Sequence, residues 1–256
     1  MKSIEVNGCR LNVQVDISHE DAPWIVFANS LLTDLSIWDA QVAVLKNQFN
    51  LLRYDQRGHG KSDVSNEVLS FEILADDVIK LMDHFNIPKA IYVGLSMGVP
   101  TGLAAYNQQR FEKMIFIDGQ TKSASNASEA WQERIDFAVA NGMEKLAELT
   151  SERWLIGFEK KSILASMMAS TPLQGFVSAA TALKNYDFSH LLSSIHCPVL
   201  LIAGVQDGKM PITMQEMAKN MVYASYIEIE NAGHVPCFEQ SERVNQHLIS
   251  FLEVQG

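Results

Sequence analysis

Short apolar runs alternate with segments of helical spacing through the first half of the chain. Asn7 and Gly8 form a turn dipeptide between two stretches of strand pattern, residues 4–6 and 11–15, which predicts a β-hairpin. Later apolar runs show no polar alternation, which is typical of parallel strands buried on both faces. These runs are residues 24–28, 51–54, 90–93 and 114–117.

Between the apolar runs lie segments with the spacing of amphipathic helices. The clearest ends before Pro88, with apolar residues recurring at intervals of three and four positions: Leu74, Val78, Leu81, Met82 and Phe85. Strands that alternate with helices predict right-handed crossovers and a mostly parallel sheet with helices on both faces. The fold class indicated is therefore α/β.

The alternation stops after Ile117. Residues 120–190 have helical spacing and no convincing strand, and strand-like runs return only at residues 198–203 and 226–229. An amphipathic helix carrying Val244, Leu248 and Leu252 follows. We therefore predict an α/β core made of residues 1–119 and 191–256, interrupted by a helical insertion, residues 120–190, which we call the cap.

Composition narrows the classes of function. The 20 Lys and Arg residues against 30 Asp and Glu give a net charge of −10. With no basic run, this acidity argues against binding to nucleic acid or to anionic membranes. An odd set of three cysteines (Cys9, Cys197 and Cys237) predicts free thiols in a reducing compartment. With neither an apolar signal core nor a run of the roughly 20 apolar residues that cross a bilayer, we expect a cytoplasmic globular protein whose oligomeric state the sequence does not indicate.

The most specific local pattern is Gly94-Leu95-Ser96-Met97-Gly98, which fits G-x-S-x-G between an apolar run and a plausible helix. Such a nucleophile elbow turns so tightly from strand to helix that a Cβ two residues either side of the serine would clash. We predict Ser96 as a nucleophile, the alternative being an ordinary helix-capping serine. Pro100 argues mildly against ideal geometry, because it falls in the first helical turn.

A serine nucleophile needs a histidine base oriented by a carboxylate. Asp207 and His234 follow the last two predicted strands, and the chain order Ser, acid, His is that of α/β-hydrolases. Loops at the carboxyl ends of parallel strands meet at one edge of the sheet, so these residues can converge with Ser96. Asp118, which ends the run at residues 114–117, is the alternative acid.

The remaining histidines, including His59 in a turn after a strand, lack metal-ligand spacing, and no phosphate-binding glycine motif is present. The sequence therefore predicts no metal and no nucleotide cofactor, and a small molecule as the partner. A serine mechanism also needs two backbone N–H groups for the oxyanion. We expect one from Met97 and the other from the loop at residues 29–34.

These settings of Ser96, Asp207 and His234 resemble the α/β-hydrolase superfamily over essentially the whole chain. The resemblance implies a mostly parallel eight-stranded sheet with a helical cap. More narrowly, residues 27–39 and 52–62 are similar to the corresponding stretches of 3-oxoadipate enol-lactonases. Asn29-Ser30 is the most specific feature, because many superfamily members have His-Gly there. Leu32 and Val99-Pro100 depart from the glycines usual in the family, and we expect Leu32 to narrow the oxyanion loop.

The resemblance implies opening of a small anionic enol-lactone, 3-oxoadipate enol-lactone to 3-oxoadipate, through an acyl-enzyme on Ser96. The amides of Leu31 and Met97 would hold the oxyanion. Trp131 and Arg134, three residues apart, would present an aromatic wall and a carboxylate-binding guanidinium. The resemblance also assigns Trp154 and Asn29 to the substrate site.

Some of these assignments have alternatives. Arg134 can instead be a surface residue paired with Glu133, Arg153 is a second candidate for the carboxylate, and Trp38 is better explained by packing. A broader carboxylesterase, or a hydrolase of carbon–carbon bonds in ring-fission products, would use the same three residues. A ligand receptor built on this fold is a further possibility, whereas an aspartate-nucleophile enzyme is disfavoured by Ser96.

Overall fold

Eight strands form a single sheet in the computed structural model, which describes residues 2–65, 67–106 and 109–253. Their order across the sheet is β1-β2-β4-β3-β5-β6-β7-β8. The first three of these pair antiparallel and the others parallel. The strands are β1 (Lys2–Val6), β2 (Cys9–Asp16), β3 (Trp24–Ala28), β4 (Asn50–Tyr54), β5 (Ala90–Leu95), β6 (Phe111–Ile117), β7 (Val199–Gly204) and β8 (Ala224–Ile229). The predicted fold class is confirmed.

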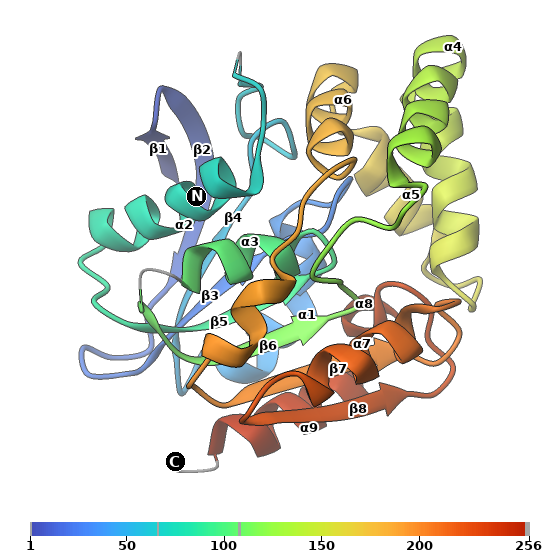
Figure 1. Cartoon of the computed structure of the whole chain (residues 1–256). Helices are drawn as coiled ribbons and strands as arrows, with labels where there is room; N and C mark the ends of the chain where they lie inside the picture. The colour runs from blue at the N-terminus through green and yellow to red at the C-terminus, as the bar shows by residue number, and fades with distance from the viewer. Residues whose placement is uncertain (1, 66, 107–108, 254–256) are drawn as a thin grey trace.

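Helices cover both faces of the sheet (Figure 1). On one face lie α1 (Asp39–Leu45) and α9 (Ser241–Glu253), which pack against each other. On the other lie α2 (Phe71–His84), α3 (Gly98–Tyr106) and α7 (Met210–Lys219). Three short helices complete the core: η1 (Leu35–Trp38), η2 (Ser189–Ser194) and α8 (Pro236–Glu239).

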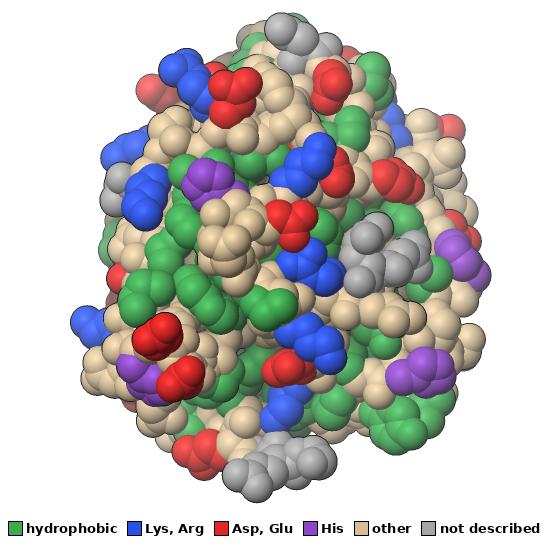
Figure 2. Space-filling view, turned by 90° about the vertical axis from the view of Figure 1, so that its left-hand side faces the viewer, with side chains coloured by type: hydrophobic (Ala, Val, Ile, Leu, Met, Phe, Trp, Pro, Cys, Tyr) green, Lys and Arg blue, Asp and Glu red, His purple; other side chains and the backbone are tan. Residues whose placement is uncertain are grey.

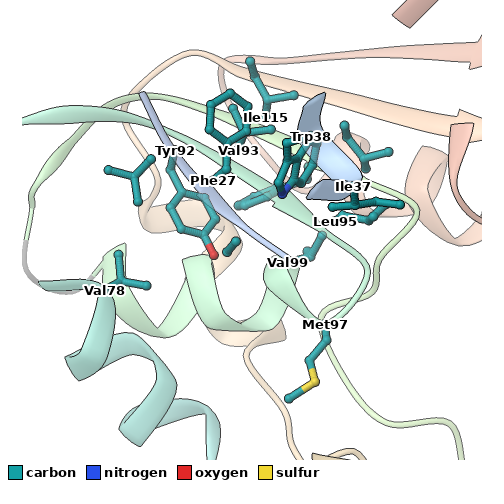
Figure 3. Packing of buried hydrophobic residues seen from close by; sticks show 14 of the residues in the cluster. Phe27, Ile37, Trp38, Val78, Tyr92, Val93, Leu95, Met97, Val99 and Ile115 are labelled. Atoms are coloured by element: carbon teal, nitrogen blue, oxygen red, sulfur yellow. The ribbon is translucent and has the colours of Figure 1, made fainter. Parts of the chain in front are cut away.

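The central strands are apolar because both of their faces are covered. Every residue of β4, β5 and β7 is buried, as the unbroken apolar runs predict. Figure 3 shows Phe27 and Trp38 side by side in this core, with ring centroids 5.1 Å apart. Full burial of one such side chain contributes about 1.5–3 kcal/mol. This packing makes the sheet a rigid support for the loops at its carboxyl edge.

The segment between β6 and β7 has a different organisation. It holds α4 (Ala127–Trp154), α5 (Lys161–Ala169) and α6 (Leu173–Ala182), which stand together at one end of the molecule (Figure 1). Its only β pairing is an isolated bridge between Lys122 and Asp187, as all of residues 120–190 are described. Gly142 interrupts α4 with φ +84°. The helical content agrees with the expected insertion, and the division into core and cap at residues 119 and 191 stays a prediction.

The acidic surplus is not gathered in one place on the face shown in Figure 2. There, basic and acidic side chains are interspersed among polar and apolar ones. Within the described ranges, no helix combines the length and apolar character needed to cross a membrane.

The cap rests on the core where two glycines meet. Gly58, with φ +74°, lies in the turn after β4, and Gly175 lies in α6. A Cβ on Gly175 would fall 2.0 Å from the carbonyl oxygen of Gly58, so the two backbones touch directly. The turn is held from below by Arg57, whose buried guanidinium donates to both carboxylate oxygens of Asp77 on α2, at 2.5 and 2.7 Å. The turn of the core that contacts the cap is therefore held in place by a buried ion pair.

Replacing Gly175 by alanine tests this contact. Alanine in place of glycine inside a helix is ordinarily stabilising by about 1 kcal/mol. Here we expect the opposite sign, a loss of about 1–3 kcal/mol, because a backbone carbonyl obstructs the new methyl group. The midpoint of thermal unfolding should fall by several degrees, at about 2–4 °C per kcal/mol for a chain of this size. A rise in the midpoint would show that α6 is free to move away from Gly58.

Candidate active site

Ser96 lies at the turn between β5 and α3, in a strained backbone conformation. Its φ of +51° is unusual for a residue with a side chain. Its amide donates to Ile117 O at 2.7 Å, and its carbonyl accepts from Val99 N at 3.0 Å. A Cβ on Gly94 would lie 2.5 Å from Gly98 O. The turn therefore has the geometry that G-x-S-x-G predicts.

Pro100 does not disturb this turn. It is the third residue of α3, where a backbone N–H would have no partner within the helix. The Ser96 carbonyl, which a non-proline residue at position 100 could have bonded, is already taken by Val99. Pro100 is therefore compatible with the geometry of the elbow, because its position in the first turn of α3 requires no backbone N–H.

A row of hydrogen bonds joins Ser96 to two residues from the carboxyl edge of the sheet. His234 Nε2 lies 2.8 Å from Ser96 Oγ, and His234 Nδ1 lies 2.6 Å from Asp207 Oδ2. Asp207 follows β7, and His234 follows β8. With the Nδ1 proton donated to Asp207, Nε2 is the acceptor for the serine hydroxyl. The arrangement can therefore withdraw a proton from Ser96 and stabilise the resulting imidazolium.

Asp118, the other acid considered, lies beside this row but is not hydrogen-bonded to the histidine. It is fully buried, with φ +41°, and its two carboxylate oxygens lie 3.0 and 3.2 Å from Gly204 N. Burial raises the pKa of Asp118 well above its usual value, and the negative charge of Asp207 raises it further. Burial therefore favours the protonated form of Asp118, in contrast to the carboxylate that an imidazolium needs.

Two backbone amides that could donate hydrogen bonds to a ligand belong to the pocket that contains Ser96. The N–H groups of Leu31 and Met97 have no acceptor among the described residues, and both residues line the same pocket as Ser96. Leu32 has φ +63° in the turn closed by Thr33 N to Ser30 O, which explains why glycine would suit this position. Its side chain is buried in the core, so the pocket wall at this loop is formed by Leu31.

The loop at residues 29–34 is held in place by the side chain of Asn29. Its side-chain NH₂ donates to Tyr54 O at 2.9 Å, and its side-chain oxygen accepts from Trp38 Nε1 at 2.9 Å. Both Asn29 and Trp38 are buried. Trp38 thus packs behind the loop, as expected. Asn29 does not reach the pocket wall, so its side chain is placed to hold the loop.

The pocket, about 280 Å³, lies over Ser96 between the cap and the carboxyl edge of the sheet. Trp131, Arg134, Arg153 and Trp154 all line it from α4. The guanidinium carbon of Arg134 lies 4.4 Å from the centre of the Trp131 ring, and the Trp154 ring lies 4.5 Å from that of His234. The predicted binding residues from the cap are therefore brought together with the reacting groups.

Neither pocket arginine has an anionic partner. Arg134 and Arg153 make no hydrogen bond or ion pair with any other described residue. Burial, and then the charge of Arg153, lower the pKa of Arg134 to about 10. Burial also lowers the pKa of Arg153, against the opposing effect of the Asp207 carboxylate. Two arginines that line one cavity without a hydrogen bond or ion pair to a described carboxylate can bind an anion there.

Tyr186 and Gln120 also line the pocket and were not predicted. Burial raises the pKa of Tyr186 to about 12, so the phenol is neutral and able to donate a hydrogen bond. Gln120 closely follows β6, and the rule that drew attention to strand ends could have found it. Tyr186 lies at the end of the insertion, outside any motif.

His59 and the three cysteines do not line the pocket. His59 is fully buried, and burial lowers its pKa to about 4, which keeps the ring neutral. Cys9, Cys197 and Cys237 are unpaired, and Cys237 is buried in the core. Among residues 2–65, 67–106 and 109–253, no group of three His, Cys, Asp or Glu side chains is placed to bind a metal ion.

This fold and this row of Ser, His and Asp define the class of α/β hydrolases. Residues 25–247 match the model of the alpha/beta hydrolase family, and the chain belongs to that family. It is 35% identical to 3-oxoadipate enol-lactonase 1 of Acinetobacter baylyi, over 96% of this chain and 94% of that protein. The crystal structure of the enol-lactonase from Burkholderia xenovorans LB400 superposes with a TM-score of 0.93, at 33% identity over 99% of this chain and 100% of that one.

A thermophilic esterase from Thermogutta terrifontis, described as malate bound, is also similar in structure. Its TM-score is 0.89 at 26% identity, over 98% of this chain and 96% of that chain. The fold is thus shared with lactonases and esterases alike, and the contents of the pocket must decide between them.

Substituting the two acids separately tests which one serves His234. Asp207→Asn should lower kcat on the order of 10³–10⁴-fold by reversing the hydrogen bond that sets the tautomer. Asp118→Asn should leave kcat within about a factor of ten of the wild type, because asparagine mimics the protonated acid. A larger loss in Asp118→Asn than in Asp207→Asn would reverse the assignment.

The same Asp118→Asn variant should alter the dependence of stability on pH. The folded-state pKa of Asp118 is raised, so the contribution of this group to the free energy of unfolding decreases as pH rises above about 4, where the unfolded chain loses this proton. Asparagine does not ionise, so this decrease in stability does not occur in the variant. The variant should gain stability relative to the wild type as pH rises above about 4, which urea unfolding at a series of pH values would measure.

Proposed function

We propose that the protein is a serine hydrolase that opens a small anionic enol-lactone, 3-oxoadipate enol-lactone to 3-oxoadipate, through an acyl-enzyme. The observation that carries this proposal is the pairing, in one small pocket, of the Ser96–His234–Asp207 row with two unpartnered arginines. The row of Ser96, His234 and Asp207 would carry out acyl transfer. The two arginines would select a substrate with a free carboxylate. The names of the related enol-lactonases support the same substrate.

The reaction begins at Ser96. His234 Nε2 takes the hydroxyl proton as the serine oxygen attacks the lactone carbonyl, and Asp207 stabilises the imidazolium that forms. The carbonyl oxygen becomes an oxyanion and accepts hydrogen bonds from the amides of Leu31 and Met97, which have no other partner in the described chain. Because these donors are fixed by the elbow and by the Asn29 loop, little reorganisation is required.

Collapse of this intermediate breaks the ring C–O bond and expels an enolate. An enolate is a better leaving group than an alkoxide, and it stays tethered to the acyl chain. The imidazolium of His234 returns its proton to the leaving group, and the neutral imidazole then activates a water molecule. Attack of this water on the acyl-enzyme releases a 3-oxo dicarboxylate and restores Ser96.

The size and charge of the pocket fit this substrate. At about 280 Å³, the cavity is below the usual 300–1,000 Å³ range for sites that hold drug-sized ligands, which favours a small molecule. The carboxylate would pair with Arg134, stacked on Trp131, and with Arg153 nearer to Asp207. The local cations thus offset a chain that is acidic overall.

The proposal is tested by following ultraviolet loss of 3-oxoadipate enol-lactone with purified protein, beside p-nitrophenyl acetate. Lactone turnover should greatly exceed ester turnover, and Ser96→Ala should abolish both. Ester turnover without lactone turnover would retain the serine mechanism and identify a broader carboxylesterase. Absence of both reactions in the wild type would refute the enzyme and favour the ligand receptor.

Removing either pocket arginine should weaken binding of the anionic substrate. In Arg134→Gln and in Arg153→Gln, KM for the lactone should rise about 10- to 100-fold, the value of a charge-assisted hydrogen bond. Hydrolysis of the neutral p-nitrophenyl acetate should change little. Arg243→Gln is the matched control, since Arg243 is exposed and, within the described part of the chain, its side chain donates a hydrogen bond only to Glu230 O, at 3.3 Å. Equal losses on both substrates would show that the arginines stabilise the pocket without recognising a carboxylate.

A further inference from the structure

The loop that carries His234 is bonded to the cap through its backbone. His234 N donates to Trp154 O, the carbonyl at the end of α4, at 2.9 Å. A Cβ on the preceding Gly233 would lie 2.3 Å from the same carbonyl oxygen. The backbone of Gly233 and His234, the predicted catalytic base, is therefore in close contact with the insertion.

One carboxylate holds both sides of this contact. Glu239, the last residue of α8, accepts from Gly233 N through Oε2 at 2.8 Å. Its Oε1 accepts from Ile156 N at 2.6 Å and from Gly157 N at 2.7 Å, in the segment that joins α4 to α5. Three backbone donors from two parts of the chain thus converge on a single side chain.

A second link runs parallel to the first. Lys160 Nζ, at the start of α5, donates to Phe238 O at 2.6 Å and lies 5.3 Å from the centre of the Phe238 ring. The junction between α4 and α5 is consequently attached to α8 at two adjacent residues, Phe238 and Glu239. The junction directly follows Arg153 and Trp154, the last two residues of α4, which line the pocket.

We propose that Glu239 is a positioning residue that sets the orientation of His234 by joining the histidine loop to the α4–α5 junction. It contacts neither Ser96 nor the pocket, so it acts through the backbone at Gly233 and Trp154. The geometry of the Ser96–His234 hydrogen bond therefore depends on the cap being seated. This inference rests on the serine mechanism of the proposed function but not on the identity of the lactone.

The variants Glu239→Ala and Glu239→Gln test it. Alanine removes all three acceptor contacts, and we expect kcat to fall about 10- to 100-fold on p-nitrophenyl acetate and on the lactone alike, with KM within about threefold. Glutamine keeps an oxygen for Ile156 and Gly157 but loses one acceptor, so its kcat should be intermediate. Glu242→Gln, at an exposed glutamate with no partner among the described residues, controls for lost charge.

Gly233→Ala perturbs the same contact without removing a hydrogen-bonding group. Its methyl group would push Trp154 O away, so kcat should fall while Lys160 and Glu239 are intact. Labelling of Ser96 by a fluorophosphonate should slow in step with kcat in each variant. Circular dichroism and thermal unfolding show whether each variant is folded at the assay temperature.

Proton NMR provides a readout that does not require turnover. The Nδ1 proton of His234, bonded to Asp207, should give a downfield resonance in the wild type and in Glu242→Gln, absent in Asp207→Asn. In Glu239→Ala this resonance should shift or broaden. An unchanged resonance together with unchanged kcat, even at lower thermal stability, would overturn the proposal. Changes in the resonance in a protein that hydrolyses neither substrate would support the positioning role while refuting the proposed function.

Discussion

The site depends on how closely the backbone of β5 approaches that of α3. Neither Gly94 nor Gly98 has room for a Cβ: at Gly98 the added atom would lie 2.6 Å from Ala28 O on the neighbouring strand. On the β5 side, a Cβ on Gly94 would lie 2.5 Å from Gly98 O, and in the tight turn between these two glycines Ser96 has positive φ and its hydroxyl lies 2.8 Å from His234 Nε2. In Figure 3 the Tyr92 hydroxyl points to α3, where it donates to Gly98 O at 2.6 Å. The strain at Ser96 is thus balanced by a buried hydrogen bond and by core packing.

Departures from the family pattern are accommodated by neighbouring residues. Val99 stands where the family usually has glycine, and it is fully buried against Gly119, which has no room for a Cβ of its own: that atom would lie 2.3 Å from Val99 Cγ2. The extra volume of the Val99 side chain is therefore accommodated by the absence of a side chain at Gly119. Leu32 keeps the left-handed turn that glycine would favour, because its side chain is buried in the core. Both changes leave the Ser96 turn intact.

Much of the fold was predictable because burial on both faces of a parallel sheet leaves unbroken apolar runs. The juxtaposition of Ser96, Asp207 and His234 was predictable because a tight elbow and strand ends restrict where such side chains can meet. The pocket-lining residues of the cap were harder to predict, because they are determined by the groups that they face across the cavity and not by a local sequence pattern. Spacing on one helix suggested Trp131 and Arg134, but no local pattern links Tyr186 to Ser96 or Glu239 to Ile156. Tyr186 and Ser96 line one pocket, and Glu239 bonds to Ile156, from segments that are distant in sequence or belong to different elements.

The meeting of Gly58 with Gly175 has a consequence for how such a chain can change. At that point the cap is supported by main-chain atoms, so the support makes no demand on the side chains of the inner wall. A residue that faces the cavity from α4 can therefore be exchanged without disturbing the contact between Gly58 and Gly175. The hydrogen bond from His234 N to Trp154 O is likewise made by main-chain atoms. At both places the insertion meets the core through backbone atoms, which every residue type supplies.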